Sequence, residues 1–282
     1  MQLRIPGPTP CPPQILQAMG GQMMNHRGPE FAEFLSSITD RLKQVFQTRS
    51  DVFLLTASGT GGMESAIVNT LSPGDKVLSV SNGFFGDRFG DIAVAYGADV
   101  IRLGFEWGKP VDPDAVDGAL RANKGIRATL VVHNETSTGV TNDLGRISTS
   151  VKASGSLLLV DAISSLGCIN VPVDSWRCDV VVTGSQKGWM VPPGLAMVSV
   201  SEEAWKAHAR AKMPRCYWDF SLIRDALQKG QTPWTPAISV CYALFVALSP
   251  VAGYSNGFAV FTILTVIALG LLYVLYRYPP AE

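Results

Sequence analysis

Three nearly continuous aliphatic runs constrain the fold of this chain more than any other feature. They read ATLVVHN (128–134), SLLLVD (156–161) and DVVVTGS (179–185). Strands of this kind are buried on both faces, which happens in a mostly parallel sheet between two layers of helices. Amphipathic patterns with helical spacing lie between several such runs. The sequence therefore predicts an α/β fold, a three-layer sandwich with a mostly parallel sheet.

The same patterns predict where the elements lie. Strands are expected at residues 52–57, 76–81, 99–103, 128–134, 157–161, 179–183 and 195–200. Helices are expected at residues 30–46, 62–71, 86–96, 113–123 and 143–153. Lys152 and Lys206 are expected at exposed helix positions.

Charge and cysteine usage exclude several classes of protein. The chain has 23 basic and 23 acidic residues, so no basic excess is available to bind nucleic acid. The five cysteines form no C-x-x-C pair and the three histidines are far apart. We therefore expect neither a disulfide framework nor a metal site, and a reducing compartment fits. The first residues lack the apolar stretch of a signal peptide.

The C-terminal part of the chain has a different character. No charged residue occurs between Lys229 and Arg277, and residues 258–276 read FAVFTILTVIALGLLYVLY. A transmembrane helix needs about 17–25 such residues, and tyrosines near both ends suit a membrane interface. The prediction is a transmembrane tail at 251–278 that contacts a membrane through 258–276. The alternative is a buried core helix.

Polar residues follow three strands of the predicted sheet, where open α/β sheets carry their chemistry. The run ASGTGGMES (57–65) leads from a strand into a helix, whose first amides and the Ser58 and Thr60 hydroxyls could bind an anion; the alternative is a simple tight turn. Asp161 ends a buried strand and needs a cationic partner, unless it caps a helix at 162–166. Lys187 follows another buried strand and is either an amine nucleophile or a surface lysine.

Together, a phosphate site, a buried acid and a nucleophilic lysine are what pyridoxal phosphate requires. At this point the sequence resembles the class V aminotransferases of PLP fold type I, near the alanine/serine–glyoxylate group. The resemblance covers about the first 245 residues and is carried by PGPTP (6–10), NHRGPEF (25–31), ASGTGGMES (57–65), NGFFGDR (82–88), HNETSTGV (133–140), LLLVDAISSLG (157–167), TGSQKGWMVPPG (183–194) and TPWTPAIS (232–239).

The resemblance implies a role for each matching residue. Lys187 would bind pyridoxal 5'-phosphate as a Schiff base and move the Cα proton, and Asp161 would keep the pyridine nitrogen protonated. The remaining cofactor contacts implied are the phosphate site Ser58, Gly59 and Thr60, the stacking residue Phe85, the hydrogen-bonding residues Ser137 and Gln186, and Thr235, which would reach the phosphate of the neighbouring subunit. The PGPTP segment would line the substrate entrance.

The resemblance also implies a function and a domain plan. The function is transfer of an amino group from a small amino acid (alanine or serine) to a 2-oxo acid such as glyoxylate, in a homodimer. The plan is an N-terminal arm (1–20) and a PLP-binding large domain (21–248), without the family's C-terminal small domain and its carboxylate-binding arginine. Apart from the resemblance, the lack of a signal peptide and the hydrophobic tail predict a cytoplasmic catalytic part that the C-terminal hydrophobic helix anchors to a membrane. The alternatives are an inactive, membrane-tethered PLP-binding remnant and a cysteine desulfurase or lyase of the same fold.

Overall fold

The computed structural model describes residue 3 and residues 5–249, which form an α/β fold around a seven-stranded sheet in the order β1-β9-β8-β7-β4-β2-β3. Its strands are β1 (Asp51–Ala57), β2 (Lys76–Ser81), β3 (Asp99–Gly104), β4 (Ala128–Val132), β7 (Leu157–Asp161), β8 (Val180–Gly184) and β9 (Gly194–Val200). Neighbours are parallel, except that β9 runs antiparallel to β8 and β1. The carboxyl ends of β1, β2, β7 and β8 therefore meet at one edge.

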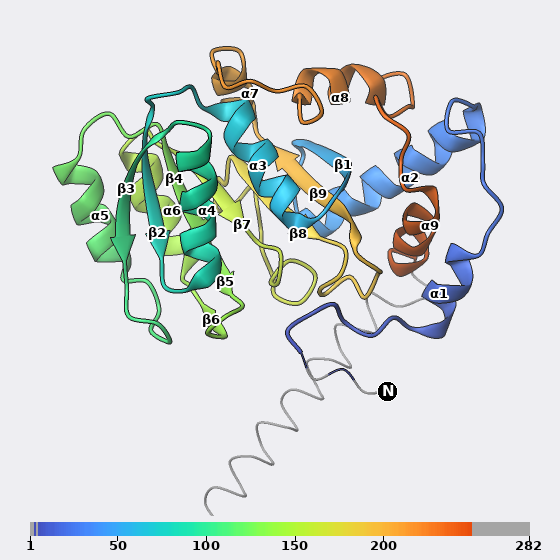
Figure 1. The fold of residues 1–282 in the computed structure, drawn as a ribbon, viewed down its shortest axis with the longest axis horizontal. Coiled ribbons are helices and arrows are strands. Elements are labelled where there is room, and N and C mark those ends of the chain that lie inside the picture. The colour runs from blue at the N-terminus through green and yellow to red at the C-terminus, as the bar shows by residue number, and fades with distance from the viewer. Residues whose placement is uncertain (1–2, 4, 250–282) are drawn as a thin grey trace, which may run out of the picture.

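Helices cover both faces of this sheet (Figure 1). One face packs against α3 (Gly59–Thr70), α4 (Phe84–Ala95), α7 (Glu202–His208) and α8 (Phe220–Leu227). The other packs against α1 (Pro13–Met19), α2 (Pro29–Phe46), α5 (Pro113–Ala122), α6 (Leu144–Ala153) and α9 (Ile238–Ala247). Within β7, Leu158 and Val160 lie in one core and Leu159 lies in the other. Burial on both faces confirms the predicted sandwich with a mostly parallel sheet.

Most predicted strands agree with the structure to within one or two residues, and 76–81 and 157–161 have the observed bounds. The prediction for 128–134 is wrong at its end, because β4 stops at Val132. Asn134 instead begins a short hairpin of β5 (Asn134–Glu135) and β6 (Val140–Thr141). The side-chain amide of Asn134 donates to the Ser164 hydroxyl and accepts from the Thr141 hydroxyl. Contacts with residues outside β4 therefore hold Asn134 away from that strand.

The predicted helix at 62–71 starts three residues late, because α3 begins at Gly59. The glycines at the start of this helix suggest a turn in the sequence, but in the structure they allow the helix to pack closely against the sheet. A Cβ added at Gly62 would lie 2.5 Å from Cγ1 of Val182 in β8. Tertiary contact therefore overrides the low helix propensity of glycine here.

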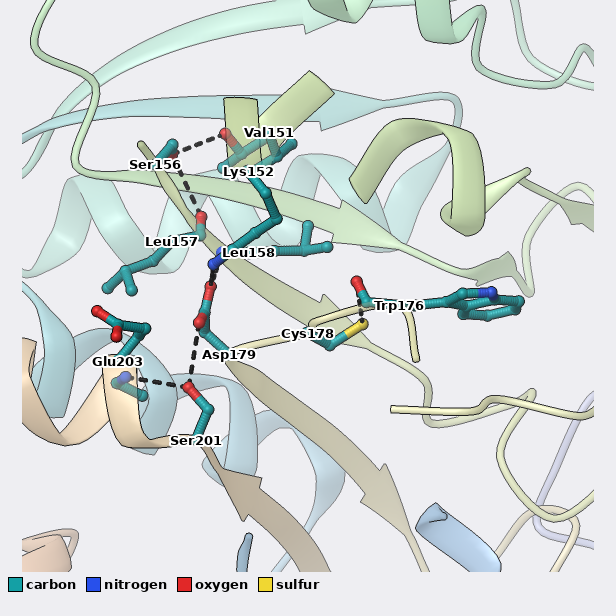
Figure 2. A network of polar contacts seen from close by, with 12 residues as sticks. Val151, Lys152, Ser156, Leu157, Leu158, Trp176, Cys178, Asp179, Ser201 and Glu203 are labelled. Carbon is teal, nitrogen blue, oxygen red and sulfur yellow. Dashed lines mark hydrogen bonds and ion pairs between the residues drawn. The ribbon is translucent and has the colours of Figure 1, made fainter. Parts of the chain in front are cut away.

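A buried ion pair ties elements together at the opposite edge of the sheet (Figure 2). Nζ of Lys152 on α6 pairs with Oδ2 of Asp179, and their side chains are 11% and 3% exposed. Oδ2 also accepts from the Leu158 amide at 2.7 Å, and Oδ1 accepts from the Ser201 hydroxyl at 3.1 Å. The expectation of an exposed Lys152 is therefore wrong, because its amine compensates a buried carboxylate. Lys206 is exposed, as expected.

Within residue 3 and residues 5–249, no helix combines the length and the apolar character that crossing a membrane requires. The predicted tail at 251–278, with its hydrophobic helix at 258–276, lies outside the described residues. Membrane contact through that tail stays a prediction.

Candidate active site

The carboxyl ends of the strands surround a cavity of about 280 Å³. This is where ligands bind in open α/β sheets. Seven of the nine predicted site residues line it. The full lining is Gly7, Pro8, Ser58, Gly59, Thr60, Met63, Phe85, Arg88, Thr136, Asp161, Ile163, Gln186, Lys187 and Pro193. A larger hollow of about 910 Å³ lies at the amino ends of β2, β4 and β7 and includes none of the predicted site residues.

Asp161 enters the cavity from the end of β7, where its side chain is 3% exposed. Its Oδ1 accepts a hydrogen bond from the Ile163 amide at 2.8 Å. Burial raises the pKa of Asp161 to about 7, although the hydrogen bond from the Ile163 amide lowers it. Of the nearby charges, Glu135 raises this pKa, and Lys187 and Arg88 lower it. Residues 162–166 form no helix, so the alternative role as a helix cap is wrong. The carboxyl group is thus placed to receive a cationic ligand atom.

Lys187 lies in the loop after β8, half-buried, with its amine held by the N-terminal arm. Nζ donates to the Pro6 carbonyl at 2.8 Å. Thr9 fixes the same loop: its amide donates to the Gln186 carbonyl at 2.9 Å and its Oγ1 donates to the Lys187 carbonyl at 3.0 Å. Burial lowers the pKa of Lys187 and the nearby Asp161 raises it. A lysine with a lowered pKa is a better amine nucleophile.

The first turn of α3 forms the wall expected to bind an anion. Ser58 is the N-cap, and its Oγ accepts from the Gly61 amide at 3.5 Å. The first amides of a helix have no acceptor within the helix, and the positive end of its dipole favours an anion. A Cβ at Gly59 would lie 2.5 Å from Cδ1 of Ile163, so the glycine lets this turn approach the loop after β7.

Phe85 lines the cavity from the first turn of α4, and sequence reasoning missed Arg88 one turn further on. The Arg88 guanidinium lies 5.1 Å from the ring centroid of Phe85 and 4.7 Å from that of Phe84. No ion pair within 4.0 Å involves Arg88 in the described part of the chain. The cavity therefore has a second cation. The available signal was the arginine that ends the NGFFGDR stretch.

Two predicted residues lie elsewhere. Ser137 does not line the cavity, although its neighbour Thr136 does. The Ser137 Oγ donates to Oε1 of Glu135 at 2.7 Å and accepts from the Phe84 amide at 3.0 Å. Thr235 is exposed before α9. Their contacts to a cofactor stay predictions.

Solved structures define the class of protein to which this architecture belongs. A crystal structure of alanine–glyoxylate aminotransferase from Nostoc sp. superposes with a TM-score of 0.86 and 32% identity, covering 90% of this chain and 69% of that one. The α/β fold thus matches the fold type I aminotransferases. The family model described as "Aminotransferase class-V" matches residues 3–220, and the chain belongs to this family.

Curated relatives extend the same likeness. The chain is 47% identical over 251 residues to the "Soluble hydrogenase 42 kDa subunit" of Anabaena cylindrica, covering 88% of this chain and 66% of that protein. It is 39% identical over 262 residues to the L-aspartate–glyoxylate aminotransferase of Paracoccus denitrificans, covering 90% and 66%. The chain thus spans just under two thirds of the length of these relatives.

Membership of this family implies pyridoxal 5'-phosphate as the cofactor, and the residues of the cavity fit that group. The Oε1 atom of Gln186 is buried without a hydrogen-bond partner in the described part of the chain, so it has an unused acceptor. Asp161 offers a buried carboxylate to a pyridinium nitrogen. Lys187 offers an amine to the aldehyde, and the α3 N-terminus offers amides to the phosphate.

Proposed function

We propose that this chain is a pyridoxal 5'-phosphate-dependent aminotransferase that moves an amino group from a small amino acid, alanine or serine, to a 2-oxo acid such as glyoxylate. One observation carries the proposal: Lys187, Asp161 and the N-terminus of α3 line the same cavity. A covalent anchor, an acid for the ring nitrogen and a phosphate site are the three protein groups that this chemistry needs.

The cofactor, when bound, supplies an electron sink for the substrate carbon. The chain's own residues supply the rest. Lys187 would attach the cofactor and move a proton to and from the substrate Cα, because burial lowers the pKa of its amine. Asp161 would hold a proton on the ring nitrogen, and Phe85 would stack on the ring. Ser58, Gly59 and Thr60 would hold the phosphate, and the free Oε1 of Gln186 would accept from the ring hydroxyl.

The substrates are proposed from the relatives. Glyoxylate is named as a substrate of the Paracoccus denitrificans relative and of the Nostoc structure, and alanine of the latter. A homodimer is proposed because the exposed Thr235 lies outside the cavity of its own chain and is free to reach a neighbouring one. The large domain at 21–248 would hold most of the cofactor site, and the arm at 1–20 would complete it through Gly7 and Pro8.

The test uses the full-length protein with added pyridoxal 5'-phosphate. A Schiff-base absorbance band should form and should disappear in Lys187→Ala, while Lys206→Ala, at an exposed helix position, keeps it. Alanine or serine should bleach the band and glyoxylate should restore it, with the matching products formed. A Lys187-independent band would refute the site. Binding without turnover would favour the inactive remnant, and sulfur release from cysteine would favour the desulfurase.

A further inference from the structure

Glu135 is a second buried carboxylate beside the cavity, and the roles assigned so far do not use it. It lies in β5 and is 0% exposed. Its Oε2 accepts from the amides of Phe85 at 3.1 Å and Gly86 at 3.0 Å. Its Oε1 accepts from the amide of Ser137 at 3.0 Å and from its hydroxyl at 2.7 Å. Four donors therefore satisfy this carboxylate within the protein.

These contacts make Glu135 the cap of α4. The N-cap residue of that helix, Gly83, has no side chain to accept a hydrogen bond, so the cap comes from a distant part of the chain. A Cβ at Gly83 would lie 2.5 Å from Cγ of Glu135 and 2.6 Å from Oγ of Ser137, so both side chains pack directly on the helix start. A negative charge at a helix N-terminus is favourable for the dipole as well as for the amides.

The helix turn that Glu135 holds is a wall of the cavity. Phe85, whose amide it binds, lines the cavity, and Arg88 lines it one turn further on. We propose that Glu135 is a positioning residue that fixes the first turn of α4 so that Phe85 and Arg88 face the bound cofactor. The cofactor part of this proposal rests on the proposed function; the placement of the helix turn does not.

The test compares Glu135→Gln with a matched change at the opposite edge of the sheet. The amide of Gln keeps the shape but turns one acceptor into a donor, so either the α4 amides or the Ser137 amide loses its acceptor. We expect pyridoxal 5'-phosphate affinity to fall about tenfold, the effect of losing one hydrogen bond to a charged group, and the visible circular dichroism of the bound cofactor to shrink. Asp179→Asn also alters a buried carboxylate, and it should lower stability but leave both cofactor signals unchanged.

A double-mutant cycle separates positioning from general damage. If Glu135 acts through Phe85 and Arg88, Glu135→Gln should change cofactor affinity much less in a background that carries Phe85→Ala and Arg88→Gln than in the wild type. Additive effects would overturn the proposal. Should Glu135→Gln fail to fold, Ser137→Ala replaces it, because it removes one donor to Glu135 and the acceptor of the Phe84 amide.

A readout without cofactor keeps the two proposals distinguishable. Hydrogen exchange of the Phe85 and Gly86 amides should be faster in Glu135→Gln than in the wild type, while amides in α6 are unchanged. Unchanged exchange at Phe85 and Gly86 would overturn the placement, whatever the cofactor signals show. A wild-type protein that binds no cofactor through Lys187 would refute the proposed function, and the exchange result would still decide the role of Glu135.

Discussion

Replacement of Lys152 by Met should destabilise this fold strongly, although the sequence alone predicts an exposed helix position for this residue. Met keeps most of the apolar stem and removes the charge. The Asp179 carboxylate would remain buried with two neutral donors, the Leu158 amide and the Ser201 hydroxyl (Figure 2). Breaking a buried ion pair by removing one partner costs about 3–5 kcal/mol. Since Lys152 is 11% exposed, we expect about 3 kcal/mol.

Thermal unfolding of the full-length protein measures this cost. At about 2–4 °C per kcal/mol, the midpoint should fall by roughly 6–12 °C. Arg146→Met is the matched control, because Arg146 lies on the same helix and pairs with Asp114 at 3.0 Å with both side chains exposed. An exposed pair contributes less than about 1 kcal/mol, so this variant should shift the midpoint by a few degrees at most.

The double variant tests the reason for the cost. Adding Asp179→Asn to Lys152→Met removes the orphaned charge, so the double variant should be less destabilised than the sum of the single changes. Additive losses would show that the two side chains are not coupled. A Lys152→Met shift no larger than that of Arg146→Met would refute the reasoning altogether.

Three further predictions concern the cavity. In the cofactor-free protein, the raised pKa of Asp161 means that the free energy of unfolding falls as pH rises from about 4 to 7. The Asp161→Asn variant should be as stable as the wild type near pH 4 and more stable by up to about 4 kcal/mol above pH 7. Equal urea midpoints of the two proteins at pH 8 would contradict this. Thr9→Val should slow borohydride labelling of Lys187 in the presence of cofactor, because it removes the hydroxyl that donates to the Lys187 carbonyl. Thr9→Ser keeps this hydroxyl and should not slow the labelling. Equal labelling rates in the two variants would argue against a positioning role for the arm. Arg88→Gln should raise the KM for an anionic 2-oxo acid about tenfold, and an unchanged KM would exclude contact between Arg88 and the substrate.

The sequence predicts the sheet well because burial on both faces leaves a local signal. The run from Leu157 to Val160 is aliphatic at every position, and the structure places successive residues in opposite cores. Two helix starts, those of α3 and α4, are predicted less well. At α4, where the predicted start at residue 86 is two residues late, the cap is Glu135, about fifty residues away in the chain, which accepts from the amides of Phe85 and Gly86.

The candidate site shows the same limit. Lys187 and Asp161 were accessible to sequence reasoning because Asp161 ends a buried strand and Lys187 lies three residues after the end of another. Arg88 was missed because a cation on an amphipathic helix resembles any solvent-facing residue, and only the fold shows which face lines a cavity. Lys152 was misjudged for the same reason, since its partner Asp179 comes from another element.

The buried carboxylate of Asp161 lines this cavity, and that of Glu135 binds the α4 turn that forms one wall. The number of hydrogen bonds that each carboxylate accepts indicates which one is available to a ligand. Glu135 accepts four hydrogen bonds from the start of α4 and from Ser137, so its charge is compensated within the protein. Among the residues that the structure describes, the Asp161 carboxyl accepts one hydrogen bond, from the Ile163 amide, and burial raises its pKa to about 7. The charge of Glu135 raises that pKa further. The protein therefore supplies enough hydrogen bonds to stabilise the Glu135 carboxylate, whereas the Asp161 carboxylate needs a cation in the cavity. For this reason Asp161, and not Glu135, is the carboxylate that a protonated ring nitrogen would stabilise.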